Sequence, residues 1–311
     1  MTKEIDFFLV GAMKAGTTTL FDSLLKHSKI YMPIEKEPFY YVWSTLEKDL
    51  FLPANNKKLV SHKRWKIFDT KNKYQKLFDD CLEDQLCGEA STFYLPHERA
   101  AAAIKSENPN AKILIVLRNP VERAYSAYNF QVSFSLEPAV SFEAALDQEL
   151  KGLRDNWLYG WRHIYCGLYY EQVKRYMDLF GEENVLVETQ DDLRSNRQEV
   201  LDRCFDFLGV EKIAVTETKN SNITFVPTGR IGKFLHFAFS RPNLIKDSVK
   251  GLLPLKYRRL IKNKVMASLA KNGKKPERMN PKTRQWLIDI FYEDILSLER
   301  LLNRDLSSWY K

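Results

Sequence analysis

Three short runs of apolar residues along the chain are typical of buried β-strands. They cover Phe7 to Val10, Lys112 to Leu117 and the stretch NVLVET, residues 184–189. After the first run the chain passes through a loop with two glycines and then shows helical spacing of apolar residues from Thr17 to Leu25. The second run stops at Asn119-Pro120, and proline suits the first turn of a helix. The first two strands are therefore predicted to lead into helices.

Three further helices are predicted from apolar spacing and capping residues. CGLYYEQVKRYMDLFG should end at Gly181, because glycine adopts the left-handed cap conformation without steric cost. SNRQEVLDRCFDFLG should open with a Ser195 cap and close on Gly209. The C-terminal stretch 280–306 is predicted to be a long helix that caps the fold. LCGEASTFYLP, residues 86–96, is polar and is interpreted as a loop.

Strands that alternate with helices predict crossover connections and a mainly parallel sheet. The chain has 311 residues, of which 44% are hydrophobic and 28% charged, enough for a large core. We expect one α/β domain over residues 1–311, with a central, mainly parallel sheet flanked by helices. No run approaches the roughly 18 to 20 apolar residues of a membrane helix, and the N-terminus lacks a signal-peptide pattern. A cytoplasmic location without a stable membrane anchor is therefore expected.

The cysteines give no sign of a metal site. Cys81, Cys87, Cys166 and Cys204 form no C-x-x-C pair and have no zinc-like spacing with the five histidines. We therefore expect them to be reduced and mostly structural, and predict no bound metal. Cys81 and Cys87 lie near enough in the sequence for a disulfide, but nothing else in the sequence requires one.

The positive charge of the chain is concentrated in one segment. The net charge is +8, and between Lys246 and Arg278 eleven Lys and Arg oppose Asp247 and Glu277, a local balance of +9. Apolar residues near helical spacing within 252–272 predict a basic amphipathic helix there. Three roles are open: a solvated outer face, a rim that attracts an anionic acceptor, or a membrane-surface contact.

FFLVGAMKAGTTTLFDSLLKHS, residues 7–28, has the strand, glycine loop and helix of a phosphate site. Backbone N–H groups of such a loop bind phosphate at the helix N-terminus, and the Thr17 and Thr18 hydroxyls can add hydrogen bonds. A nucleotide triphosphatase has its lysine directly after the second glycine, where this chain has Thr17. Lys14 instead lies inside the loop, where it can neutralise charge on a phosphate that serves as a leaving group. The alternative is an ordinary glycine turn with a surface lysine.

LRNPVERAYSAYNF, residues 117–130, supplies a second candidate anion site. Arg118 ends a strand, and Ser126 falls on the second turn of the helix that begins near Pro120. Arginine offers a forked donor and serine a hydroxyl, although Arg118 could also pair with a nearby carboxylate. Ligands of parallel sheets lie beyond the carboxyl ends of the strands, where both motifs occur.

Together these motifs resemble those of the sulfotransferases that use 3′-phosphoadenosine 5′-phosphosulfate (PAPS). The family's 5′-phosphosulfate loop reads like G-x-x-K-x-G-T-[TS], and its 3′-phosphate motif like L-R-[ND]-P-x-[ED]-R-[AV]-x-S-x-[YF]. EKEPFYY, GEASTFYLP, KNSNITFVPTGRIGKFL and ERLLNRDLSSW look like their counterparts in the bacterial and heparan-sulfate branch. The resemblance implies the P-loop-like sulfotransferase fold, with PAPS as co-substrate and adenosine 3′,5′-bisphosphate (PAP) as product.

The resemblance also implies roles for individual residues. It implies in-line transfer of the sulfuryl group to an acceptor hydroxyl or amine, with Lys14 stabilising the leaving phosphate and without a metal. The residues expected to bind the nucleotide are Lys14, Ala15, Gly16, Thr17, Thr18 and Thr19 at the 5′-phosphate, and Arg118, Ser126 and Arg230 at the 3′-phosphate.

The acceptor needs a base, and the resemblance points to Glu37. Glu37 in EKEPFYY matches the glutamate of a motif like E-x-H-[FY]-[FY], but Phe39 stands in place of the usual histidine. Glu89 in CGEAST is a second candidate for the base or for an acceptor contact. His97 and His163 could substitute.

Two other protein classes are open. A P-loop kinase or NTPase predicts lysine after the second glycine and an aspartate at the end of a neighbouring strand for Mg²⁺, whereas ILIVL ends in Arg118. A basic nucleic-acid-binding or membrane-surface protein would explain the segment 246–278 but not the phosphate motifs. The expected partner is a saccharide or small-molecule acceptor, anionic acceptors included, and not a nucleic acid. The aromatic stretches FYYVW and NWLYGWRHIYCGLYY either contact that acceptor or pack in the core.

Overall fold

The architecture is taken from a computed structural model of the chain. It describes residues 4–43, 68, 70–133, 136–215 and 277–311. Arg230 and the basic segment up to residue 276 lie outside these ranges.

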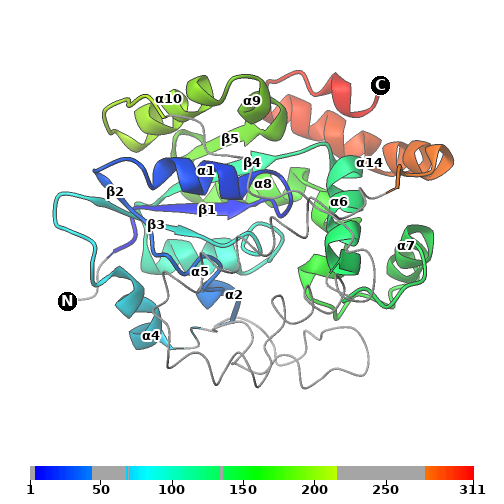
Figure 1. Ribbon diagram of the computed structural model, residues 1–311, viewed down its shortest axis with the longest axis horizontal. Helices are drawn as coiled ribbons and strands as arrows, with labels where there is room; N and C mark the ends of the chain where they lie inside the picture. The colour runs from blue at the N-terminus through cyan, green and yellow to red at the C-terminus, as the bar shows by residue number, and fades with distance from the viewer. Residues whose placement is uncertain (1–3, 44–67, 69, 134–135, 216–276) are drawn as a thin grey trace, which may run out of the picture.

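A five-stranded parallel sheet forms the centre of the molecule, with the strand order β2-β3-β1-β4-β5 (Figure 1). Its strands are β1 (Phe7–Gly11), β2 (Ile30–Tyr31), β3 (Leu86–Ala90), β4 (Lys112–Leu117) and β5 (Val185–Thr189). β1 and β4 are apolar almost throughout, as expected for strands covered on both faces. The predicted α/β fold with a parallel sheet is confirmed.

Helices cover the sheet. They are α1 (Thr17–Leu24), α2 (Tyr40–Trp43), α4 (Lys71–Gln75), α5 (Ala100–Glu107), α6 (Pro120–Ser133), α7 (Phe142–Leu150), α8 (Tyr170–Phe180), α9 (Gln190–Ser195), α10 (Arg197–Leu208) and α14 (Pro281–Leu302). α1 packs against α10, and α5 packs against α8. β1 has β3 on one side and β4 on the other, so its carboxyl end is a switch point of the topology, where ligands bind in such sheets.

The long C-terminal helix is confirmed as α14. The Asn280 side chain accepts a hydrogen bond from the Lys282 backbone N–H, Pro281 occupies the first turn, and Asn303 ends the helix in the left-handed conformation. Its buried stripe includes Leu287, Phe291, Ile295 and Leu298, and the helix packs against α6 and α8. This C-terminal segment therefore belongs to the same packed body as the sheet.

Residues 86–96 are not the loop that their polarity suggests, because Leu86–Ala90 form β3. Gly88 lies opposite Phe7 in the ladder, and a Cβ at residue 88 would come within 2.1 Å of the Phe7 ring. The strand therefore needs a glycine where an apolar residue would have marked it. Glu89 is fully buried, and tyrosine hydroxyls bind its carboxylate.

Two local predictions are wrong. Cys81 and Cys87 form a disulfide, with their Cα atoms 6.4 Å apart, because the turn before β3 brings them together. Cys166 and Cys204 are free and buried, as expected. Ser195 does not cap α10, since it is the last residue of α9; the Asn196 side chain accepts the capping hydrogen bond from the Glu199 backbone N–H.

Candidate active site

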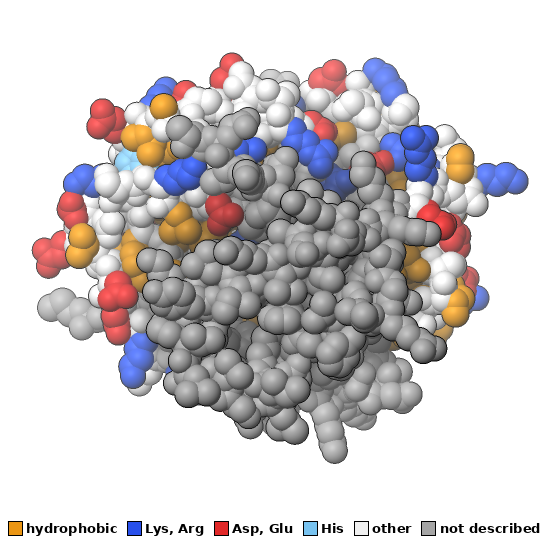
Figure 2. Space-filling view, viewed as in Figure 1, with side chains coloured by type: hydrophobic (Ala, Val, Ile, Leu, Met, Phe, Trp, Pro, Cys, Tyr) orange, Lys and Arg blue, Asp and Glu red, His pale blue; other side chains and the backbone are white. Residues whose placement is uncertain are grey.

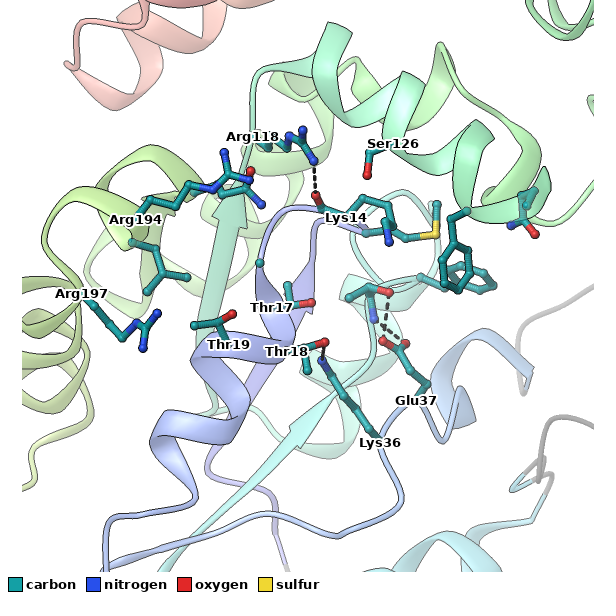
Figure 3. A pocket seen from close by; sticks show the side chains of 18 of the residues that line it. Lys14, Thr17, Thr18, Thr19, Lys36, Glu37, Arg118, Ser126, Arg194 and Arg197 are labelled. Atoms are coloured by element: carbon teal, nitrogen blue, oxygen red, sulfur yellow. Dashed lines mark hydrogen bonds between the residues drawn. The ribbon is translucent and has the colours of Figure 1, made fainter. Parts of the chain in front are cut away.

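A cavity of about 590 Å³ opens at the carboxyl edge of the sheet. Its lining comes from the segments that follow each of the five strands, β1 to β5, and from α6 (Figure 3). In Figure 2, Lys and Arg side chains gather at the upper middle of the face, where Figure 1 places the end of β4 and the start of α6. Five basic side chains and one carboxylate, all among the described residues, line the cavity.

The glycine loop leaves the start of α1 open to a ligand. Gly16 has a φ of 100°, and α1 begins at Thr17 without a side-chain cap. The first N–H groups of a helix have no partner within it, so this end offers donors and positive partial charge to an anion. Thr17, Thr18 and Thr19 line the cavity beside these groups. An uncapped helix start beside hydroxyl side chains is a geometry that a phosphate-binding loop requires.

Lys14 extends into the cavity from a backbone in the left-handed region, with a φ of 70°. Its Nζ lies 4.2 Å from the centroid of the Phe130 ring, a cation–π contact. Burial, and next the charge of Arg118, lower the pKa of Lys14 to about 8. A bound anion would oppose both effects and favour the charged form.

Glu37 lines the same cavity, and Thr92 fixes its carboxylate. The Thr92 backbone N–H donates to Oε2 at 2.8 Å, and the Thr92 hydroxyl donates to Oε1 at 3.0 Å. Burial raises the pKa of Glu37, while Lys36 and the Thr92 hydrogen bonds act in the opposite direction. Phe39, at the position of the family's histidine, packs against Phe93 with ring centroids 4.9 Å apart. Phe39 cannot form a hydrogen bond through its side chain, and Thr92 is the residue that orients the Glu37 carboxylate.

Lys36 connects the loop to this carboxylate, and the sequence motifs did not single it out. Its Nζ donates a hydrogen bond of 3.2 Å to the Thr18 hydroxyl, as Figure 3 shows. Burial lowers the pKa of Lys36, and the neighbouring charges of Glu37 and Asp22 partly restore it. The lysine therefore places a second cation between the phosphate loop and Glu37.

Arg118 and Ser126 lie on the side of the loop opposite Lys36 and Glu37 (Figure 3). Both line the cavity, and Arg118 Nη1 donates to the Lys14 carbonyl at 3.2 Å. Arg118 Nη2 lies 3.9 Å from Glu122 Oε2, so the carboxylate pairing weighed as an alternative exists. Glu122, however, also pairs with Arg284. Burial and then the charge of Arg194 lower the pKa of Arg118.

The other base candidates lie away from the cavity lining. Glu89 Oε2 accepts hydrogen bonds from the hydroxyls of Tyr74 (2.6 Å) and Tyr94 (3.1 Å), and burial raises the pKa of Glu89 to about 7. His97 and His163 are buried. Most of the two aromatic stretches is packed core, for example Tyr40, Tyr41, Tyr159 and Trp161, as one of the two interpretations stated.

Four lining residues come from the segment after β5, which no motif marked. They are Gln190, Leu193, Arg194 and Arg197. Ligands bind beyond the carboxyl ends of parallel strands, and this rule applies to β5 as well. It was the one feature of the sequence that could have indicated these four residues.

Among the described residues, no helix is long and apolar enough to cross a membrane. In the same part of the chain, His, Cys, Asp and Glu form no group of three or more that could hold a metal ion.

A parallel α/β sheet with an open helix N-terminus and a cation-lined cavity at its switch point defines a protein that binds phosphorylated ligands. The family described as sulfotransferase domain matches residues 4–225, and the chain belongs to this family. The fold agrees with a crystal structure of a sulfotransferase from Alicyclobacillus acidocaldarius, with a TM-score of 0.74 and 29% identity over 99% of this chain and 100% of that one.

Curated relatives share the domain but are longer proteins. The membrane-associated sulfotransferase kil1 of Dictyostelium discoideum is 32% identical over 132 residues, 42% of this chain and 23% of its own length. The bifunctional heparan sulfate N-deacetylase/N-sulfotransferase 4 of Mus musculus is 25% identical over 98% of this chain and 31% of its own length. Human heparan sulfate glucosamine 3-O-sulfotransferase 3B1 is 24% identical over 66% of this chain and 46% of its own. The matched region spans less than half the length of each of these three relatives.

Proposed function

We propose that this protein transfers a sulfuryl group from PAPS to a hydroxyl or amine of a saccharide or small-molecule acceptor. One observation carries the proposal: Lys14 and Glu37 line the same cavity, and the Thr18–Lys36 hydrogen bond lies beside Glu37 (Figure 3). A cation for the leaving group and a carboxylate for the acceptor proton are the two groups that such a transfer needs.

The cavity suits a donor that carries an anionic group at each end. The loop at Gly16, Thr17 and Thr18, with Lys14, binds the 5′-phosphosulfate, and Ala15 and Thr19 flank it. Arg118 and Ser126 bind the 3′-phosphate at the other end. Five cations against one carboxylate leave an excess of positive charge that such a nucleotide would balance.

The transfer is a single displacement at sulfur. The acceptor oxygen forms a bond to sulfur as the bond between sulfur and the bridging oxygen of the 5′-phosphate breaks, and PAP leaves with the electron pair. Glu37 takes the acceptor proton, and Thr92 keeps its two oxygens in place. Lys14 stabilises the charge that develops on the bridging oxygen, which is a preorganised electrostatic contribution.

The acceptor side of the cavity is partly apolar. Phe39, Phe93 and Phe130 line it near Glu37 and Lys14. Aromatic faces stack on sugar rings and on aromatic groups, which supports a saccharide or an aromatic small molecule. Two of the relatives described above carry heparan sulfate in their names, and this supports the saccharide.

The alternative activities fit the site less well. A kinase or NTPase uses a lysine after the second glycine, and this chain has Thr17 there. A protein that binds nucleic acid through surface charge would not require Lys14, Lys36 and Arg118 to line one cavity with a carboxylate.

Transfer from ³⁵S-labelled PAPS to a panel of saccharide and phenolic acceptors tests the proposal. We expect a labelled product and stoichiometric PAP with the wild type, and neither with Lys14→Ala. A thermal-shift series with PAP, ATP and a DNA oligomer should give the largest stabilisation with PAP, because a ligand that binds only the folded state raises the melting temperature. Stabilisation by ATP but not by PAP would contradict the proposal.

A further inference from the structure

Lys36 and Glu37 are neighbours in the sequence, yet both side chains line the cavity. In an extended chain, successive side chains point to opposite sides. Here Glu37 has a left-handed backbone, with a φ of 62°, and its N–H donates a hydrogen bond of 2.9 Å to the Ala90 carbonyl at the end of β3. The turn at Glu37 therefore gives one wall of the cavity both a carboxylate and an ammonium group (Figure 3).

The ammonium group of Lys36 is held by residues of α1. Its Nζ donates a hydrogen bond of 3.2 Å to the Thr18 hydroxyl and lies 5.2 Å from the centroid of the Phe21 ring. Burial lowers the pKa of Lys36, and the charges of Glu37 and then Asp22 raise it. Contacts within the protein therefore fix this positive charge beside Glu37.

The surroundings of the Glu37 carboxylate are partly apolar. Phe39 and Phe93 line the cavity near it, and Thr92 supplies one N–H and one hydroxyl. Burial raises the pKa of Glu37, and among the influences that oppose burial the charge of Lys36 comes first, before the two Thr92 hydrogen bonds. A carboxylate that has to accept a proton must be ionised beforehand, and a nearby cation favours that form.

Glu89 and Lys14 do not replace this cation. Glu89 on β3 is buried, and burial and, less strongly, the charge of Glu37 raise its pKa to about 7. An ionised Glu89 would add negative charge near Glu37 and would therefore oppose its ionisation. Lys14, in the loop after β1, lines the same cavity, but its proposed contact is the leaving phosphate of the donor.

We propose that Lys36 is a positioning residue for the base: its ammonium, fixed by Thr18 and Phe21, keeps the Glu37 carboxylate ionised and ready to take the acceptor proton. This inference rests on the proposed function, in which Glu37 is the base. Thr18 also belongs to the loop proposed to bind the 5′-phosphosulfate, so the same lysine connects the base with the donor end of the cavity.

Infrared difference titration of the protein without nucleotide tests the inference. The spectrum of the wild type minus that of Glu37→Gln isolates the carboxyl band of residue 37, and its change with pH gives the pKa of Glu37. The same difference is taken in the background of Lys36→Met, which removes the charge, and of Lys36→Arg, which keeps it. Thr18→Val, which removes only the hydrogen bond to the lysine, is the milder second variant. Lys212→Met, which loses a lysine from an exposed ion pair with Asp206, is the control.

We expect Lys36→Met to raise the pKa of Glu37 by about one pH unit or more, because a nearby opposite charge has an effect of this size on a carboxyl group. Thr18→Val should raise it less, and Lys36→Arg and the control should stay near the wild-type value. In transfer assays with Lys36→Met, the acid limb of the pH profile should move upward by the same amount. Thermal unfolding of each variant checks that it is folded.

The inference would be overturned by an unchanged pKa of Glu37 in both Lys36→Met and Thr18→Val, or by equal increases in Lys36→Met and Lys36→Arg. A lower maximum rate with an unmoved acid limb would also overturn it, because a purely structural role has that effect. The titration uses neither donor nor acceptor, so it is read independently of any transfer. A wild type that transfers no sulfuryl group from PAPS would instead count against the proposed function.

Discussion

The guanidinium of Arg118 donates a hydrogen bond of 3.2 Å to the backbone carbonyl of Lys14, across 104 residues of sequence. The side chain proposed to bind the 3′-phosphate therefore also holds the loop that carries the leaving-group lysine. Binding at one end of the nucleotide and the position of Lys14 at the other are physically connected, so changes at Arg118 should affect both.

Arg118→Ala should weaken PAP binding by about tenfold or more, because a charged, forked contact to phosphate is lost. It should also reduce turnover at saturating PAPS, since the Lys14 carbonyl loses its donor. Arg118→Lys should restore part of the affinity through its charge, but not the turnover. Equilibrium titration and initial rates separate the two effects. PAP affinity unchanged in Arg118→Ala would show that the 3′-phosphate site is misplaced.

Lys14→Ala should lower turnover by two or more orders of magnitude while PAP affinity changes little, because the lysine acts mainly on charge that develops during transfer. Single-turnover rates with labelled PAPS measure this. Lys212→Ala, which removes a charge from an exposed ion pair on the surface, is the matched control and should have no effect. The role assigned to Lys14 does not survive if the variant turns over at the wild-type rate.

Glu37→Gln should keep PAP binding and lose about a hundredfold or more in transfer to a hydroxyl acceptor, because the amide cannot accept the proton. Thr92→Val should cause a smaller loss, since one of two hydrogen bonds that orient the carboxylate disappears. Glu89→Gln is the comparison: its carboxylate is buried against Tyr74 and Tyr94, so turnover per folded molecule should persist. A reversed pattern, with Glu89→Gln inactive and Glu37→Gln active, would move the base to Glu89.

The pH dependence of kcat/KM should be bell-shaped. Activity needs Glu37 deprotonated, and burial raises its pKa, so the acid limb should lie above the ordinary range of a glutamate. Activity also needs Lys14 protonated, and its pKa is lowered to about 8, so the rate should fall as pH rises through that value. PAP binding near pH 8 should take up protons, because the anion favours the charged lysine. Titrations in buffers of different ionisation enthalpy would detect this uptake, and Lys14→Ala should abolish it.

The sequence predicted the strands that consist of consecutive apolar residues. β1, β4 and β5 are of this kind. β3 is not, because Gly88 makes room for Phe7 and Glu89 is satisfied by tyrosines that come from other segments. A strand that depends on contacts with distant segments has no recognisable pattern in its own sequence. The Cys81–Cys87 disulfide has the same origin, since only the fold around the turn fixes the distance between the two thiols.

The same distinction separates the predicted and the missed residues of the cavity. Lys14, Thr17 and Thr18 lie in one contiguous motif, and Arg118 and Ser126 in another, so short spacings were enough to identify them. Thr92 lies in GEASTFYLP, which resembles the family without giving Thr92 a role, and Arg197 reaches the cavity from a segment after β5 in which no motif was found. The resemblance placed Glu37 before Glu89 as the base, but the sequence does not show that Glu37 lines the cavity while Glu89 is buried against tyrosines.

Lys14 and Glu37 both have a left-handed backbone, with φ of 70° and 62°. For residues with a Cβ this conformation costs about 1–2 kcal/mol each. A thermostabilisation campaign that ranks positions by relief of backbone strain would therefore select both for glycine, and would delete the proposed acid–base and electrostatic machinery together. At these two positions a gain in thermal stability would reduce turnover. A more thermostable enzyme would therefore need stabilising substitutions in other parts of the chain.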